Sequence, residues 1–286
     1  MYKIGFITYD ALPNLAKDEV DLPAMLLQHS ILVEPVIWSD RNTNWNNYDL
    51  FIFRSPWDYF KRINEFQKFL DFAEDEKLKT YNSIGTIREN MDKHYLSELK
   101  KKGISVCPSV FLKKEKSIDL KEIMLLNNWE TIVIKPTISG TAFHTYKVRL
   151  DDIGTFQNLF NKLKDEHTFI LQPFFQEIET FGEKSLIYFN KQFSHAILKK
   201  AKQGDFRVQG EFGGTVQEYF PSPDELHYAK EIVDKIDDAL LYARVDFITS
   251  NNIHYLMELE LFEPSLYLIN NAAKQNFATA ILQICN

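Results

Sequence analysis

The sequence predicts an α/β protein, and three observations support this class. Over roughly the first ninety residues, short apolar strands alternate with helical segments in a β-α-β-β-α order, which is typical of a parallel sheet covered by helices. From Phe169 onwards, the pattern indicates mainly strands joined by tight turns. No internal repeat or Pro/Gly-rich linker separates these regions, so we expect them to share extensive interfaces.

In the first region, apolar runs predict strands at residues 4–8, 32–37 and 50–53, and helices at 22–28 and 63–73. Ligands of such sheets bind at the carboxyl ends of the strands. The segment after the third strand is therefore a candidate substrate site, with an arginine that suits a substrate carboxylate. An ordinary exposed turn fits the same pattern. The candidate residues are Arg54, Ser55, Trp57 and Asp58.

The middle of the chain predicts a helix at 91–102, closed by Gly103, and a strand at 105–112. Two further strands, at 131–136 and 144–150, are joined by a loop with small and hydroxyl residues, including Ser139 and Gly140. The backbone N–H groups of such a loop can bind phosphates. A simple hairpin connection explains the loop equally well.

The last region predicts a strand at 169–175 and a hairpin whose two-residue turn is Asn190-Lys191. Ser222 and Pro223 are typical of a helix start. A second hairpin spans residues 244–268, and a helix at 272–284 follows.

The second hairpin carries three carboxylates. Glu258 and Glu260 are two residues apart, so both lie on one face of their strand, and Asp246 can join them from the neighbouring strand. Oxygen ligands without His or Cys suit Mg²⁺. The sequence therefore predicts a magnesium site, and the alternative is an ordinary solvated face.

Composition excludes several classes of function. The 286 residues are 45% hydrophobic and 26% charged, with a formal net charge of −7, which argues against a broad nucleic-acid or anionic-membrane surface. The two cysteines, Cys107 and Cys285, form no disulfide framework. Without a signal-peptide core or an apolar run of membrane-spanning length, we expect a cytoplasmic protein.

A series of short motifs, each weak alone, is more specific in its order and spacing. Together they resemble the ATP-grasp superfamily, on the branch of glutathione synthetase and the ribosomal-protein glutamate ligase, and most of all the D-cycloserine-forming ligases. The resemblance covers essentially the whole chain. The motifs are DK at 92–93, IKP at 134–136, QPF at 172–174, GE at 182–183, GDFRVQGEFGG at 204–214, RVD at 244–246 and MELELFEPSL at 257–266, together with RSPWDYF at 54–60.

The resemblance implies an ATP-grasp fold, with a Rossmann-like N-terminal domain at 1–90 and two lobes, 91–170 and 171–286, that clamp ATP. It also implies a ligase that phosphorylates a carboxylate with ATP, lets an amine attack the acyl phosphate, and releases ADP and phosphate. Mg²⁺ or Mn²⁺ would accompany ATP. A small amino-acid-like molecule is the expected substrate, joined to an amine or cyclised. A peptide-modifying ligase and an inactive nucleotide-binding module are the alternatives, and a homodimer is left open.

The resemblance assigns nucleotide-binding roles by position. Lys93 and Lys135 match lysines that contact the phosphates, for which their compact charge is suited. Residues 172–174 match the hinge that recognises adenine, namely Gln172, Pro173 and Phe174. Glu183 matches the ribose-binding acid, with Glu177 and Glu179 as alternatives.

The same resemblance assigns catalytic roles to Arg207, Lys199 and Arg244, and substrate contacts to Gly213, Gly214 and Ser265. Strand alternation predicts that only one of Lys199 and Lys200 faces the site. Two features depart from the family pattern. Glu260 stands where Asn is frequent, and the loop at 137–143 is poor in glycine.

Overall fold

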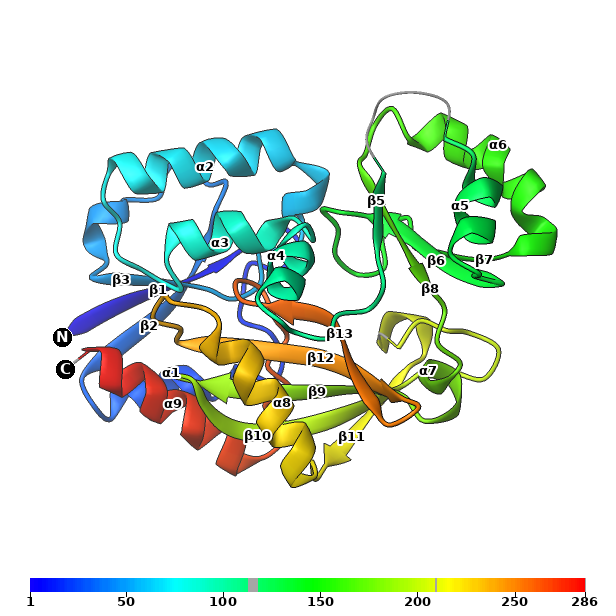
Figure 1. The fold of residues 1–286 in the computed structure, drawn as a ribbon. Helices are drawn as coiled ribbons and strands as arrows, with labels where there is room; N and C mark the ends of the chain where they lie inside the picture. Colours follow the sequence, from blue (N-terminus) through cyan, green and yellow to red (C-terminus); the bar gives the residue numbers. More distant parts are fainter. Residues whose placement is uncertain (113–117, 209, 286) are drawn as a thin grey trace.

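The computed structural model describes residues 1–112, 118–208 and 210–285, which are built around three β-sheets (Figure 1). The N-terminal sheet has the strand order β2-β1-β3-β4 and is parallel, as the alternation of strands and helices predicts. Its strands are β1 (Tyr2–Thr8), β2 (Ile31–Ile37), β3 (Leu50–Phe53) and β4 (Thr80–Tyr81), and its helices are α1 (Leu22–Leu27), α2 (Ile63–Asp75) and α3 (Ile84–Met91).

A second, antiparallel sheet of order β5-β8-β6-β7 forms a smaller lobe with two helices (Figure 1). Sequence analysis missed both helices. The first of them begins at a capping residue, Asp119, whose side chain accepts a hydrogen bond from the backbone N–H of Glu122. The elements are β5 (Val110–Leu112), β6 (Thr131–Pro136), β7 (Tyr146–Arg149), β8 (Phe169–Pro173), α5 (Leu120–Leu126) and α6 (Ile153–Leu163).

The third sheet, of order β11-β10-β9-β12-β13, is antiparallel and is the centre of the molecule. Both predicted hairpins are present, and the turn residues Asn190, Lys191, Asn251 and Asn252 all have positive φ. The strands are β9 (Glu183–Phe189), β10 (Gln192–Lys200), β11 (Thr215–Tyr219), β12 (Tyr242–Ser250) and β13 (Ile253–Glu260).

Helices cover the central sheet. Helix α8 begins after Ser222, as predicted. Ser222 and Glu225 form a capping box there. The helices are α4 (Tyr95–Lys101), α7 (Glu177–Thr180), α8 (Pro223–Asp234) and α9 (Asn271–Cys285), and the one-turn 3₁₀ segments of the described chain are Trp45–Asn47, Tyr59–Lys61, Leu150–Asp152 and Gly210–Phe212.

The N-terminal sheet and the central sheet share one hydrophobic core. Buried residues of β1, such as Ile4 and Phe6, belong to the same cluster as Ile187 of β9 and Phe277 of α9. The expected extensive interface between the regions is therefore present. It holds the carboxyl end of β3 against the central sheet.

Two predicted elements differ from the structure. The helix predicted at 91–102 begins only at Tyr95, because the backbone N–H of Lys93 donates to the carbonyl oxygen of Thr137 (2.9 Å) in a link between α3 and α4. The strand predicted at 105–112 is divided at Pro108, which has no N–H to donate. Before it, the N–H of Cys107 donates to Leu256 of β13 (2.9 Å), and only Val110–Leu112 joins the smaller sheet.

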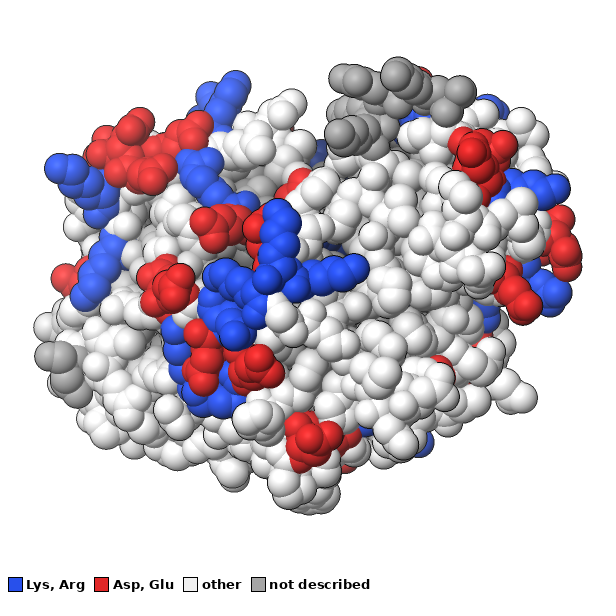
Figure 2. Space-filling model, in the orientation of Figure 1, with Lys and Arg blue, Asp and Glu red and all other residues white. Residues whose placement is uncertain are grey.

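No helix in the described ranges is long and apolar enough to cross a membrane. On the face drawn in Figure 2, basic side chains of the described residues gather in one group near the centre, and acidic side chains lie next to it.

Candidate active site

A cavity of about 420 Å³ lies where the three sheets meet. The smaller lobe contributes Lys135 from β6, the central sheet contributes Asp246 and Glu258, and the N-terminal region contributes Trp57 and Tyr59. This volume lies in the range of small-molecule sites. Polar and charged side chains from segments far apart in sequence therefore converge on one space.

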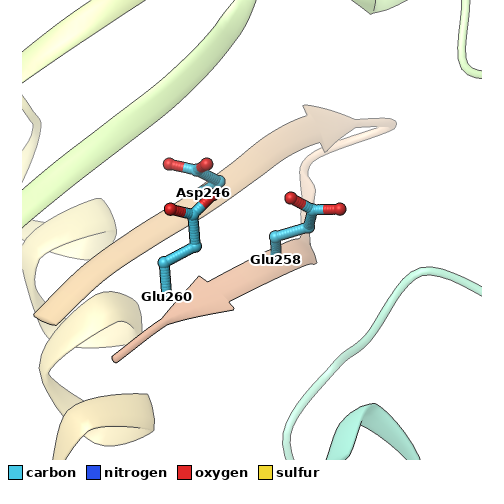
Figure 3. Close-up of side chains that lie close together, drawn as sticks. All are labelled: Asp246, Glu258 and Glu260. Carbon is cyan, nitrogen blue, oxygen red and sulfur yellow. The ribbon is translucent and has the colours of Figure 1, made fainter. Parts of the chain in front are cut away.

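The floor of this cavity is the β12–β13 hairpin. Asp246 pairs directly with Glu258, and Arg244 pairs with Glu260. The three carboxylates project from the same side of the hairpin (Figure 3), and one oxygen from each lies within 4.8 Å of the others. Strand alternation and register thus bring Asp246 to the two glutamates, as expected from the sequence.

Basic side chains surround these carboxylates, three from other elements and one, Arg244, from β12 itself. The Nζ atom of Lys135 lies 2.7 Å from Glu258, and that of Lys93 lies 3.8 Å from the same carboxylate. Lys199 lies 2.9 Å from Asp246, and Arg244 pairs with both Asp246 and Glu260. Asp246 is only 1% exposed. The solvated-face alternative is therefore wrong.

The electrostatic balance differs among the carboxylates. Burial opposes ionisation of Glu258, but the adjacent Lys135 and Lys93 lower its pKa to about 2. Burial raises the pKa of Glu260 to about 7, and the neighbouring Asp246 and Glu258 add to this effect although Arg244 opposes it. The same hairpin thus holds one carboxyl group that is firmly ionised, Glu258, and one, Glu260, that resists ionisation without a further cation beside it.

The donor set fits a hard divalent cation. It consists of carboxylate oxygens alone, close enough to share one ion, and a cation there would stabilise the ionised form of Glu260.

Lys93 and the predicted phosphate loop form one end of the cavity. The ammonium of Lys93 donates to the carbonyl oxygen of Ser139 (3.1 Å) and to its hydroxyl (3.2 Å). Gly140 packs on Phe60 so closely that an added Cβ would lie 3.0 Å from the ring. A side chain at this position would push the loop away, so glycine allows the loop to close on the cavity.

The predicted adenine hinge is only partly at the cavity. Gln172 and Pro173 line it, whereas Phe174 does not. The N–H of Phe174 donates to the carbonyl oxygen of Thr131 (2.9 Å), and its ring lies 3.7 Å from the ammonium of Lys147. The backbone N–H of Phe174 therefore links β8 to β6 and cannot donate to adenine.

Among the three acids considered for ribose, the structure brings only Glu183 to the cavity. It lies 2.5 Å from Lys199, which is buried, whereas the next residue, Lys200, is exposed. This agrees with the prediction that one of the two lysines faces the site. Glu179 instead pairs with Lys147 (2.6 Å), and Glu177 begins the short helix α7.

Arg207 lies at the rim of the cavity, on the loop between β10 and β11. Its guanidinium donates from Nε and Nη2 to the two carboxylate oxygens of Asp205 (3.0 and 2.7 Å) and lies 3.7 Å from the ring centre of Phe212. These hydrogen bonds lower the pKa of Asp205 to about 2. Gly213 and Gly214, predicted to approach the substrate, are outside the cavity lining.

The predicted carboxylate clamp is not available to a ligand in this structure. Arg54 is 1% exposed and donates to Glu19 (2.7 Å) and to the carbonyl oxygen of Pro264 (2.9 Å). Ser55 donates to Thr8, and Asp58 accepts from Trp38 and Arg62. Burial of the strand end explains why these three residues are absent from the lining.

Trp57 and Ser265, in contrast, line the cavity as predicted. Sequence analysis missed other lining residues, and four of these have titratable side chains. Two of them are Tyr59, which is buried, and Tyr95, which is half-buried, and desolvation raises the pKa of both. The remaining two are Glu263 and Tyr267, which follow the hairpin. Glu263 belongs to the motif at 257–266. Its side-chain direction could not be predicted, because the strand and its alternation end at Glu260.

The fold and the cavity define the class of the protein. A smaller antiparallel lobe faces a carboxylate-bearing hairpin of a larger antiparallel sheet, with two lysines between them, as in ATP-dependent ligases of the ATP-grasp type. The model of the RimK-like ATP-grasp domain matches residues 98–285, and the chain belongs to this family. It is an ATP-grasp ligase, one of the enzymes that use ATP to join a carboxylate to an amine. Residues 4–82 match the N-terminal domain of D-cycloserine synthetase DcsG.

Individual relatives agree with this family. The chain is 24% identical over 266 residues to the cycloserine biosynthesis protein DcsG of Streptomyces lavendulae, covering 87% of this chain and 88% of the relative. The crystal structure of D-cycloserine synthetase DcsG shares the fold with a TM-score of 0.87 and 23% identity, over 99% of this chain and 100% of that one. D-alanine–D-alanine ligase of Bacillus anthracis, complexed with ATP, has a TM-score of 0.69 and 14% identity, over 100% and 96%.

Proposed function

We propose that this ligase uses ATP to phosphorylate the carboxylate of a small amino-acid-like substrate, and that an amine then attacks the acyl phosphate. An amide and the products ADP and phosphate result, and the amine belongs either to the same molecule or to a second one. One observation carries the proposal. Lys93 and Lys135 both approach Glu258, the central carboxylate of the hairpin, so cations for the phosphates and ligands for a metal meet at one point.

Nucleotide binding is assigned along the cavity. Lys93, Lys135 and the loop of Ser139 and Gly140 would contact the phosphates, and the hydrogen bonds of Lys93 to Ser139 support their joint action. Glu183 would accept hydrogen bonds from the ribose. Gln172 and Pro173 would lie beside the adenine, since both line the cavity.

Asp246, Glu258 and Glu260 would hold Mg²⁺ or Mn²⁺, as their shared oxygen cluster supports. A divalent ion held by these carboxylates would neutralise charge on the phosphates of the nucleotide and so favour phosphoryl transfer. Arg207 would contact the transferring phosphoryl group, for which a planar guanidinium is suited. Lys199 and Arg244 are assigned to keeping the carboxylates ionised, because both are buried and ion-paired to Asp246.

We further propose that the chain divides functionally at residues 90 and 170, into an N-terminal domain that shapes the substrate end and two lobes that enclose ATP. The substrate contacts would come from Trp57 and Ser265, both in the cavity lining. A cytoplasmic location, a homodimer and the exclusion of nucleic acid stay predictions from the sequence.

The direct test is a coupled assay of ADP release over free amino acids, singly and in pairs, with mass spectrometry of the products. ADP and phosphate with a new amide support the proposal. AMP and pyrophosphate would contradict the acyl-phosphate route, because they require attack at the α-phosphate. Activity on peptides alone would favour the peptide-modifying alternative. ATP binding without turnover on any acceptor would favour an inactive nucleotide-binding module.

A matched pair of variants accompanies this assay. Lys199→Met removes a buried cation at the cavity, and Lys200→Met makes the same change on the exposed neighbour. Only the first should lower turnover.

A further inference from the structure

Glu263 is unusual among the carboxylates that line the cavity. The other four each pair with a basic nitrogen less than 3 Å away: Glu183 and Asp246 with Lys199, Glu258 with Lys135, and Glu260 with Arg244. Glu263 forms no ion pair within the described ranges of the chain. A carboxylate that faces a cavity without its own cation is suited to bind one from a ligand.

The position of Glu263 is fixed by the N-terminal region. The indole N–H of Trp57 donates to the carbonyl oxygen of Glu263 (3.0 Å), and Arg54 donates to that of Pro264 (2.9 Å). The hydroxyl of Tyr59 forms a hydrogen bond with the carboxyl group itself. Arg54 is thus a positioning residue for this segment, and the carboxyl group is held in place before a ligand binds.

Glu263 lies at the phosphate end of the cavity and not at the adenine end. An added Cβ on Gly140 would lie 3.8 Å from its Oε1 atom, and Gly140 follows Ser139, which binds the ammonium of Lys93. In the proposed reaction, the substrate carboxylate must meet the γ-phosphate at this end. Burial and the neighbouring Glu260 raise the pKa of Glu263, and a plain carboxylate placed beside it would oppose its ionisation further.

An ammonium group on the substrate would instead stabilise the ionised form of Glu263 and form an ion pair with it. We propose that Glu263, held by Tyr59 and by the backbone contacts of Trp57 and Arg54, binds the ammonium group next to the carboxylate that is phosphorylated. The acceptor is therefore an amino acid with a free ammonium group, and not a simple carboxylic acid. This inference rests on the proposed function and names the class of its substrate.

The test compares each amino acid that supports ADP release with the same acid lacking its ammonium group. The unaltered enzyme should prefer the amino acid, and Glu263→Gln should lose about 10- to 100-fold in kcat/KM for the amino acid but little for the deaminated acid. ATP affinity should stay unchanged in the variant. Glu34→Gln is the matched control, since Glu34 lies on β2, outside the cavity lining, and pairs with Lys3 of β1.

Calorimetry with the same pairs of acids, in the presence of a non-hydrolysable ATP analogue and Mg²⁺, measures recognition without turnover. Equal binding of the amino acid and its deaminated form by the unaltered enzyme would overturn the role of Glu263, and so would an unchanged preference in Glu263→Gln. Neither result would touch the ligase function. Absence of ADP release with every acid, alongside ammonium-dependent binding, would instead reject the proposed reaction and keep the ammonium site.

Discussion

The β12–β13 hairpin and the loop at residues 204–214 were both expected to carry site residues. They differ in how many of these residues line the cavity. All four hairpin residues, Arg244, Asp246, Glu258 and Glu260, line the cavity, whereas Arg207 is the one member of the predicted loop set that does so. Strand alternation and cross-strand register fix where hairpin side chains point. A loop has no comparable rule, so its residues cannot be placed from spacing.

Their electrostatics differ in the same way. The hairpin carboxylates are paired with basic residues from β6, β10 and the α3–α4 link, so they join distant parts of the chain. Arg207 pairs with Asp205 in its own loop, and its side chain is 32% exposed. We therefore expect changes in the hairpin to affect binding and chemistry together, and changes in the loop to act mainly on rate or on local stability.

Glu258→Gln should have the largest effect, because Glu258 is both a proposed metal ligand and the partner of Lys135 and Lys93. Turnover should fall by roughly 100- to 1000-fold, the scale at which a preorganised electrostatic contact acts. ADP release over a Mg²⁺ titration measures it, and circular dichroism checks the fold. Glu231→Gln, an exposed position on α8, is the control. Full activity of the unaltered enzyme in excess chelator would refute the metal site.

Lys135→Met should come next, since it removes a buried cation and keeps the aliphatic length. We expect the dissociation constant for ATP to rise about 10- to 100-fold, as for a lost charged hydrogen bond. Isothermal titration calorimetry measures this value. Lys121→Met, an exposed lysine of the same lobe, should leave it unchanged. No change in Lys135→Met would mean that this lysine only neutralises Glu258.

Much of the fold follows from the sequence, because apolar runs such as β3 and β6 begin and end where predicted. The hairpin site follows as well, since alternation alone places Glu258 and Glu260 together. Arg54 shows the limit. Its strand end is covered by the central sheet and by Glu19, and no local pattern reports a contact with Pro264, which is 210 residues away.

Arg207→Ala tests whether the loop at residues 204–214 contributes to turnover. Because Arg207 lies at the rim and not beside the paired lysines, we expect kcat to fall about 10- to 100-fold while the Michaelis constant for ATP changes by less than about 3-fold. Steady-state kinetics with separation of the nucleotide products measures both. Arg149→Ala, 68% exposed, is the control. A larger effect on ATP binding than on turnover would place Arg207 with the hairpin cations.

Gly213→Ala should have the smallest effect. Gly213 has φ +82°, which a side chain disfavours, and an added Cβ would lie 3.1 Å from Cδ of the flexible Lys202. We expect a loss of about 1 kcal/mol in the free energy of unfolding and a change in kcat/KM of less than about 3-fold. Gly154→Ala, on α6 with nothing near its added Cβ, makes the same change without a positive φ. Thermal unfolding and steady-state kinetics of both variants measure the outcome. A tenfold rise in the Michaelis constant for the amino-acid substrate, with stability unchanged, would show that the loop contacts the substrate. The loop would then resemble the hairpin in contributing directly to the site.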